Sequence, residues 1–255
     1  MKKHTIKAAA AALAVSAVAS VQAGTLSYSP KETVSYLEDS GLSIDLTVTS
    51  DTFFGVVPAA FASYTINEMV DFTAYGLFWG AGTGLNWGNW TEFGFGLNFK
   101  PTPYIDINPQ VGFLGGSLLS SAALGPGVLG DGWVPNLTAN LDTDQWEGEI
   151  YFGAYLPIRN PTFPVPGVGT LSFLHYWANF GYKANDVVSF GGHFEQLTGG
   201  ANATAATIYT WVGPYIQLRN EDKGLFFRVA GGWDASGWAA NSSDTFYKMT
   251  VGLSF

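Results

Sequence analysis

The feature that most constrains this chain is an alternation of apolar and polar side chains, which recurs in segments of about ten residues. The stretch FYKMTVGLSF (246–255) shows it plainly, because every second side chain from Tyr247 to Phe255 is apolar. The same rule holds in DQWEGEIYFGAYLPI (144–158) and TEFGFGLNFK (91–100). Successive side chains of a strand point to opposite faces, so each segment predicts a β-strand with one apolar and one polar face.

The composition requires an apolar environment for one of these faces. Only 12% of the residues are charged, whereas 16% are aromatic and 32 are glycine, which is too apolar for a surface that faces water on all sides. Nothing in the chain approaches the roughly 20 consecutive apolar residues of a membrane-spanning helix. Strands cross lipid only in a closed barrel, because every backbone polar group must be bonded internally. The alternation therefore predicts an all-β fold, a transmembrane antiparallel up-and-down β-barrel.

The N-terminal region has the pattern of an export signal followed by a short helix. MKKHTIK is basic, AAAAALAVSAVA is apolar and VQA ends in a small residue, so a secretory signal peptide is expected over residues 1–23. In residues 24–41, Pro30 at a first helical position and Gly41 at a stop predict a short helix. This segment lies in the periplasm or plugs the barrel, which is expected to span residues 42–255.

Turn-forming residues divide the rest of the chain into about twelve predicted strands. Short polar connections alternate with longer stretches rich in Gly, Ser, Asn and Pro, as at the two ends of an outer-membrane barrel. The first strand is predicted to end at a bend near residues 57–58. Without the irregular segments 59–66 and 132–141 the barrel would have ten strands. Pro109 and Pro214 fall inside predicted strands, where each removes a ladder donor and predicts a bulge or a local break.

The final strand ends in an aromatic residue and keeps the alternation to Phe255. In this it resembles the Gram-negative outer-membrane β-barrel superfamily. The stretches SDTFFGV (50–56) and DFTAYGLFWG (71–80) also resemble small porin-like families of that group. The resemblance implies location in the outer membrane of a Gram-negative bacterium and contact with membrane lipid and lipopolysaccharide. It also implies that the barrel-assembly machinery reads this strand. The solute and the oligomeric state stay open.

The charged residues of the predicted strands lie on the polar faces. On the lipid face, an Arg or Lys near the midplane of the membrane would cost about 2 to 4 kcal/mol. Acidic residues outnumber basic ones in this set, which favours cations in an enclosed passage. We therefore expect a diffusion channel for small neutral or cationic solutes. The alternative is that the charges pair and the barrel is a non-conducting scaffold, receptor or assembly partner. The expected lumen-lining residues are Asp45, Asp71, Glu92, Asp106, Glu147, Glu149, Glu195, Lys100, Lys183, Arg219, Arg228 and Lys248, with Asp51 and Asp234 beside them.

Several large aromatic side chains are also expected to point inward. They could stack on flat or sugar-like solutes, but space filling and interfacial girdles are the favoured interpretation. The apolar segment 116–130 is the longest predicted loop and could constrict the lumen, cover its mouth or lie on the membrane. The inward aromatic residues are Tyr75, Trp79, Tyr151, Tyr155, Trp177, Tyr209, Trp211 and Tyr215.

Motifs for catalysis or metal binding are weak. His175 and His193 are followed by YW and FE, without the His-x-Ser or Asp-x-His spacing of barrel lipases and proteases. His193 and Glu195 share a face, but a nucleophile cannot be assigned to them. The chain has no cysteine, and its carboxylates recur at the strand period rather than in a metal-ligand loop. We expect no catalytic residue, cofactor or metal, and with a net charge of −9 no nucleic-acid partner.

Overall fold

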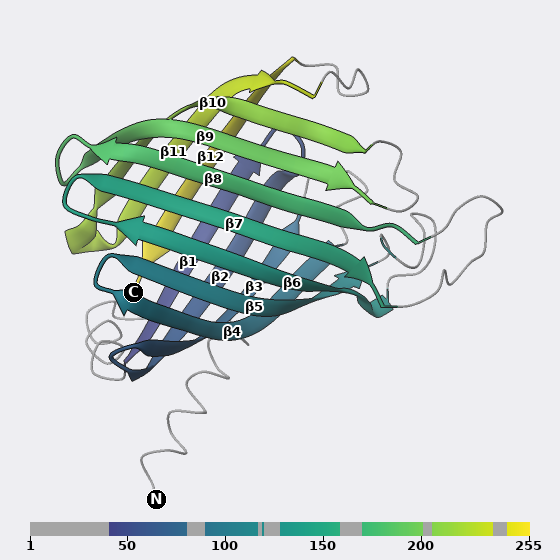
Figure 1. Cartoon of the computed structure of the whole chain (residues 1–255), viewed down its shortest axis with the longest axis horizontal. Helices are drawn as coiled ribbons and strands as arrows, with labels where there is room; N and C mark the ends of the chain where they lie inside the picture. Colours follow the sequence, from purple (N-terminus) through teal and green to yellow (C-terminus); the bar gives the residue numbers. More distant parts are fainter. Residues whose placement is uncertain are drawn as a thin grey trace, which may run out of the picture.

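Twelve antiparallel strands form one closed barrel in the computed structural model of the chain (Figure 1). The structure describes residues 41–80, 90–116, 119, 128–158, 170–200, 206–236 and 244–255. The strands are β1 (Leu42–Asp51), β2 (Gly55–Asn67), β3 (Val70–Trp79), β4 (Trp90–Thr102), β5 (Ile105–Gly116), β6 (Val128–Asp142), β7 (Trp146–Pro157), β8 (Phe173–Lys183), β9 (Val188–Gly199), β10 (Thr207–Asn220), β11 (Leu225–Asp234) and β12 (Thr245–Ser254). The predicted barrel is confirmed, and the ten-strand alternative is wrong. The predicted signal peptide and N-terminal helix lie outside the described residues.

The barrel closes where β1 pairs with β12. The two strands are in antiparallel register from Asp45 opposite Ser254 to Asp51 opposite Lys248. Beyond this ladder, the N–H of Phe255 donates to the carbonyl of Ile44 at 2.9 Å, and the N–H of Ile44 donates back to Phe255 at 3.2 Å. Closure leaves no strand edge exposed to lipid, which is the condition for a sheet to cross a membrane.

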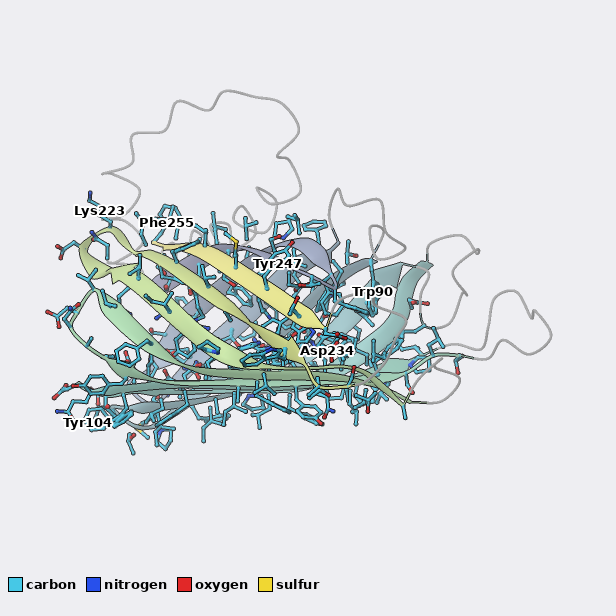
Figure 2. The ribbon with its side chains drawn as sticks, turned by 90° about the horizontal axis from the view of Figure 1, so that it is seen from above. Trp90, Tyr104, Lys223, Asp234, Tyr247 and Phe255 are labelled. Atoms are coloured by element: carbon cyan, nitrogen blue, oxygen red, sulfur yellow. The ribbon has the colours of Figure 1, made fainter. Side chains whose placement is uncertain are left out.

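The outer wall of the barrel is apolar along its length. On β4, for example, Phe93, Phe95, Leu97 and Phe99 are all exposed, whereas Glu92 near the start of the same strand is buried. On β12, Tyr247, Met249 and Val251 are exposed in the same alternation, as an interface with hydrocarbon requires. Figure 2 shows these side chains projecting from the ribbon.

The described residues include no helix that is long and apolar enough to cross a membrane.

The short turns and the long connections lie at opposite ends of the barrel. Tyr104, Lys223 and Phe255 mark the end with the short turns, and Trp90 and Asp234 lie toward the other end (Figure 2). A short 3₁₀-helix, η2 (Glu221–Lys223), forms one of these turns. We call the two ends the turn end and the loop end. The alternation of short and long connections follows the prediction except between β1 and β2, where a short turn lies at the loop end.

The connection between β1 and β2 differs from the prediction. β1 ends at Asp51 and β2 begins at Gly55, so the predicted continuation of the first strand to a bend near Pro58 is wrong. The Oδ1 atom of Asp51 accepts the N–H groups of Phe53 at 2.9 Å and of Phe54 at 2.6 Å. Gly55 then adopts a φ of 73°, which favours glycine. The aspartate side chain satisfies the backbone of a tight turn, and this ends the strand.

The prolines inside strands interrupt pairing with one neighbour only. Pro109 pairs with Leu137 of β6, whereas the ladder between β4 and β5 skips it. Pro214 pairs with Gly192 of β9, whereas the ladder between β10 and β11 skips it. The predicted local breaks are therefore confirmed, because each missing N–H removes a ladder bond on one side.

Glycines on the inner wall make room for aromatic rings that lie flat along it. Tyr75 of β3 crosses Gly94 and Gly112, where an added Cβ atom would overlap its ring or hydroxyl. Tyr215 of β10 crosses Gly181 in the same way. The high glycine content thus has a packing reason, since the inner wall must hold large rings within a narrow cylinder.

Residues 116–130, the longest predicted loop, are described only in part. Their last residues belong to β6, which begins at Val128. Leu119 is buried, and its N–H donates to the Oδ2 atom of Asp131 at 2.6 Å. Its carbonyl accepts the N–H of Leu171 at 2.9 Å. The rest of the segment lies outside the described residues.

Candidate functional site

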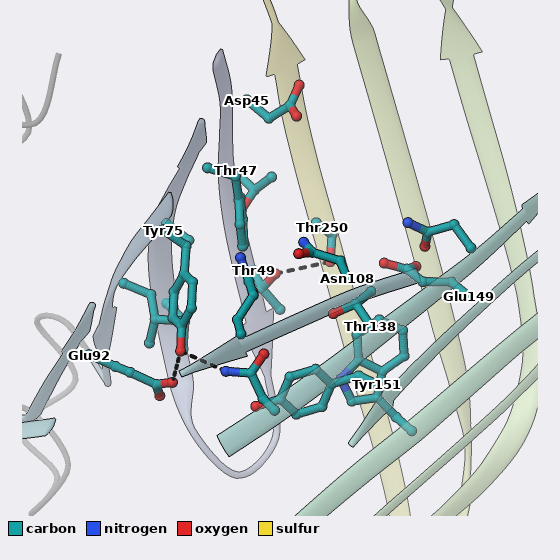
Figure 3. A pocket seen from close by; sticks show the side chains of 18 of the residues that line it. Asp45, Thr47, Thr49, Tyr75, Glu92, Asn108, Thr138, Glu149, Tyr151 and Thr250 are labelled. Carbon is teal, nitrogen blue, oxygen red and sulfur yellow. Dashed lines mark hydrogen bonds between the residues drawn. The ribbon is translucent and has the colours of Figure 1, made fainter. Parts of the chain in front are cut away.

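The lumen contains a cavity of about 580 Å³ (Figure 3). This volume falls within the range of about 300 to 1,000 Å³ that is usual for small-molecule sites. Among the described residues that line it are five carboxylates and two Lys or Arg side chains. The charged lining residues are Asp45, Asp51, Asp71, Glu92, Glu149, Arg228 and Lys248.

Aromatic side chains fill the lumen on the loop-end side of this cavity. We call this set the aromatic layer; it comprises Phe53, Phe54, Trp79, Trp90, Tyr155, Tyr209, Trp211 and Phe246. The β1–β2 turn places its two Phe rings inside the barrel, where Phe54 lies 4.5 Å from Trp79 and Phe53 lies 5.0 Å from Tyr209 between ring centroids. Trp79 and Tyr209 belong to β3 and β10, on nearly opposite sides of the ring of strands. The layer therefore spans the lumen.

A buried carboxylate on β9 organises the wall beside this layer. Glu195 is 0% exposed and accepts hydrogen bonds from His175 Nε2 at 2.8 Å and from the Tyr209 hydroxyl at 2.8 Å. Lys248 Nζ lies 2.5 Å and His193 Nε2 3.3 Å from its Oε2 atom. Charge pairing and hydrogen bonds offset the cost of burying this carboxylate. Both histidines considered as catalytic candidates are thus engaged with one structural acid.

A second ionic group lies on β7, β10 and β11. Glu147 accepts the Tyr215 hydroxyl at 2.7 Å and forms an ion pair with Arg219. Glu149 forms an ion pair with Arg228 Nη1 at 2.7 Å. Glu149 and Arg228 line the cavity, whereas Glu147 and Arg219 do not. Much of the lumen charge on this side is therefore neutralised within the wall.

The other expected lumen residues, except Asp234, lie nearer the turn end. Lys100 Nζ is 2.8 Å from an Oδ atom of Asp71, and Lys183 pairs with an aspartate at the end of β6. Asp106 accepts one long amide hydrogen bond of 3.4 Å from β4. Asp45 lines the cavity on β1. Asp234 accepts backbone N–H groups at the loop end and is not part of the cavity lining.

Sequence reasoning missed the neutral part of the cavity wall. Thr73 Oγ1 donates to Asn108 Oδ1 at 2.9 Å and accepts from Gln110 Nε2 at 2.9 Å. Across the closing seam, the hydroxyls of Thr49 and Thr250 lie 3.1 Å apart (Figure 3). These residues share the inward parity of the charged ones, so the same alternation would have found them. Thr47, Thr138, Asn136 and Asn140 also line the cavity.

Comparison with known proteins shows which solved structures share this fold. No curated protein matches the chain in sequence. A NanC porin structure superimposes with a TM-score of 0.52 at 10% identity, covering 83% of this chain and 98% of the porin. An outer membrane channel from Pseudomonas putida F1 gives a TM-score of 0.50 at 10% identity, covering 84% and 96% of the two chains. The chain thus shares the fold of porin-like barrels, and by a family model that matches residues 1–255 it belongs to a family of unknown function, DUF6733.

Proposed function

We propose that the protein is a channel of the bacterial outer membrane that passes small neutral or cationic solutes through an acidic lumen. The observation that carries this proposal is the cavity inside the closed barrel, with five carboxylates and two Lys or Arg side chains among its described lining residues. Low-dielectric walls concentrate the field of such charges and raise the local concentration of cations. Contact with lipid and lipopolysaccharide, and insertion by the barrel-assembly machinery, belong to the same proposal.

The net charge of the cavity comes from carboxylates that lack a cationic partner. Glu149 and Asp71 are paired with Arg228 and Lys100. In contrast, Asp45, Asp51 and Glu92 have no ion pair among the described residues. Carboxylates without an ion pair attract cations and repel anions, which supports a preference for cations over anions.

Single-channel recording in planar bilayers tests this function. We expect ohmic current steps, with a reversal potential in a salt gradient that indicates cation preference. A barrel whose folding is verified by circular dichroism but which gives no current would contradict the proposal. Anion preference would contradict only the assignment of solute charge.

A non-conducting barrel that serves as a scaffold, receptor or assembly partner is the second candidate. The aromatic layer favours it, because Phe54 is only 3% exposed between rings from both sides of the lumen. Under the channel proposal the β1–β2 turn must move or leave a narrow passage. Replacing Phe54 with Ser discriminates between the two: current that appears only in this variant would favour the closed barrel.

A further inference from the structure

Of the two buried carboxylates at the loop end of the cavity, Asp51 lies opposite Lys248 of β12, whereas Glu92 has no cationic partner in the described part of the chain. Glu92 is 2% exposed and accepts hydrogen bonds from the Tyr75 hydroxyl at 2.7 Å and from Trp79 Nε1 at 3.2 Å, both neutral donors. Asp51 is 3% exposed and accepts backbone N–H groups of the β1–β2 turn. A buried carboxylate is unstable without a counter-charge, so it must be protonated or must bind a cation.

Two further side-chain atoms of the cavity wall are buried with no hydrogen-bond partner in the part of the chain that the structure describes. Asn136 donates through Nδ2 to the Tyr75 hydroxyl at 2.9 Å and to the Val134 carbonyl at 3.2 Å, so its Oδ1 is fixed as the acceptor that lacks a partner. His175 Nε2 faces the Glu195 carboxylate, which only accepts. In the neutral ring Nδ1 is then an acceptor, and it too has no hydrogen-bond partner. Both residues line the cavity.

Aromatic rings surround the same end of the cavity. Phe54, Trp79, Tyr151 and Tyr155 line it together with His175. The rings pack closely, with centroid separations of 4.5 Å between Phe54 and Trp79 and 5.7 Å between Tyr151 and His175. Figure 3 shows Glu92 and Tyr75 on one wall and Tyr151 on another. Ring faces and carboxylates together attract organic cations more strongly than either alone.

A second buried Tyr–Glu pair, between β10 and β7, shows what Glu92 lacks. Glu147 is 6% exposed and accepts the hydroxyl of Tyr215, which crosses Gly181 as Tyr75 crosses Gly112. The two Tyr–Glu hydrogen bonds have the same length, 2.7 Å. At Glu147, however, Arg219 supplies the positive charge. No described residue supplies one at Glu92.

We propose that the cation at Glu92 comes from a ligand, and that this end of the cavity binds a small organic cation with several N–H donors, such as an alkylammonium or a guanidinium. Its donors would reach the carboxylate of Glu92 and the free acceptors of Asn136 and His175, while its alkyl part would lie against the rings. The inference deepens the proposed function, on which it rests for access of solute to the cavity.

Calorimetric titration of the purified full chain in detergent micelles tests the ligand class. The probes are butane-1,4-diammonium, the neutral 1,4-butanediol of equal length, and tetramethylammonium, a cation without N–H groups. We expect the diammonium to bind at least tenfold more tightly than either control. Equal affinity for the diol would overturn the charge requirement, and equal affinity for tetramethylammonium would overturn the donor requirement. Absence of binding by all three would overturn the site.

Matched variants locate the site within the barrel. Glu92→Gln should weaken diammonium binding at least tenfold. Glu147→Gln also removes one buried negative charge but lies outside the cavity lining, so its affinity should equal that of the wild type. An equal loss in both variants would overturn the assignment to Glu92. If Glu92→Gln does not fold, as judged by circular dichroism, Asp51→Asn replaces it and should also weaken binding.

Binding and conduction fail in different ways. A barrel that binds the diammonium but gives no current in bilayers would contradict the channel proposal and support the site. A barrel that conducts but does not distinguish the diammonium from the diol would contradict the site alone.

Discussion

The lumen has two levels that are built from opposite materials. At the loop end, the aromatic layer excludes water, with Tyr209 at 0% and Trp211 at 2% exposure. Toward the turn end, the cavity wall carries hydroxyls, amides and ions around about 580 Å³ of space. A twelve-stranded barrel lies between the filled eight-stranded and the open sixteen-stranded sizes. The comparison teaches that a barrel of this diameter can be filled by side chains at one level and remain hollow at another.

The strongest test of this contrast is to remove Phe54, the ring in the middle of the aromatic layer. Phe54→Ala should lower the free energy of unfolding by about 3 to 5 kcal/mol, because a buried ring is lost from the middle of the layer. The same change should increase conductance severalfold. Urea titration followed by tryptophan fluorescence and single-channel recording measure the two effects.

The control for this variant is Phe61→Ala, which removes a ring from the hollow level. Phe61 lines the cavity and is 39% exposed, so its loss should cost much less stability. Equal effects of the two substitutions would show that the two levels do not differ as described.

The next effect concerns the charge cluster beside the layer. Glu195→Gln leaves Lys248 and two histidines around a neutral amide, and should destabilise the barrel by about 3 kcal/mol. Asp142 is 64% exposed and forms an ion pair with Lys183. Asp142→Asn breaks this exposed pair and should cost about 0 to 1 kcal/mol. Chemical denaturation of both variants measures the difference, and similar losses would contradict the special role of burial.

A smaller effect is expected where rings lie flat on glycine. Gly112→Ala would push a Cβ atom into the Tyr75 hydroxyl and should cost about 1 to 3 kcal/mol. Gly192→Ala meets nothing within 4 Å and is the matched control on β9. If both alanine variants have wild-type unfolding midpoints, the inner wall is less tightly packed than the structure indicates.

The smallest effect is on ion selectivity. Asp45→Asn removes an unpaired carboxylate from the cavity wall and should shift the reversal potential in a salt gradient toward zero. Asp144→Asn alters an exposed residue of a short turn and should leave it nearly unchanged. A larger shift from the turn residue would place the selectivity outside the cavity.

The faces of the strands could be predicted, but the first turn could not. Alternation marks which side chains share a face, and this holds in any barrel that keeps lipid outside and water inside. The end of β1 at Asp51 depends on hydrogen bonds from that side chain to Phe53 and Phe54. Trp79, Tyr155, Tyr209 and Trp211 were predicted to point inward, but the two Phe rings that the turn adds to the aromatic layer were not.

The sequence by itself determined a closed barrel of strands with an apolar outer and a polar inner wall, because side-chain direction in a strand has a period of two. Only the tertiary structure decided which inward charges are neutralised. Glu147 meets Arg219, which is 72 positions away along the chain, whereas Glu92 meets only neutral donors among the described residues. Such partners depend on the stagger and closure of the whole ring of strands, and these are set by all twelve registers together.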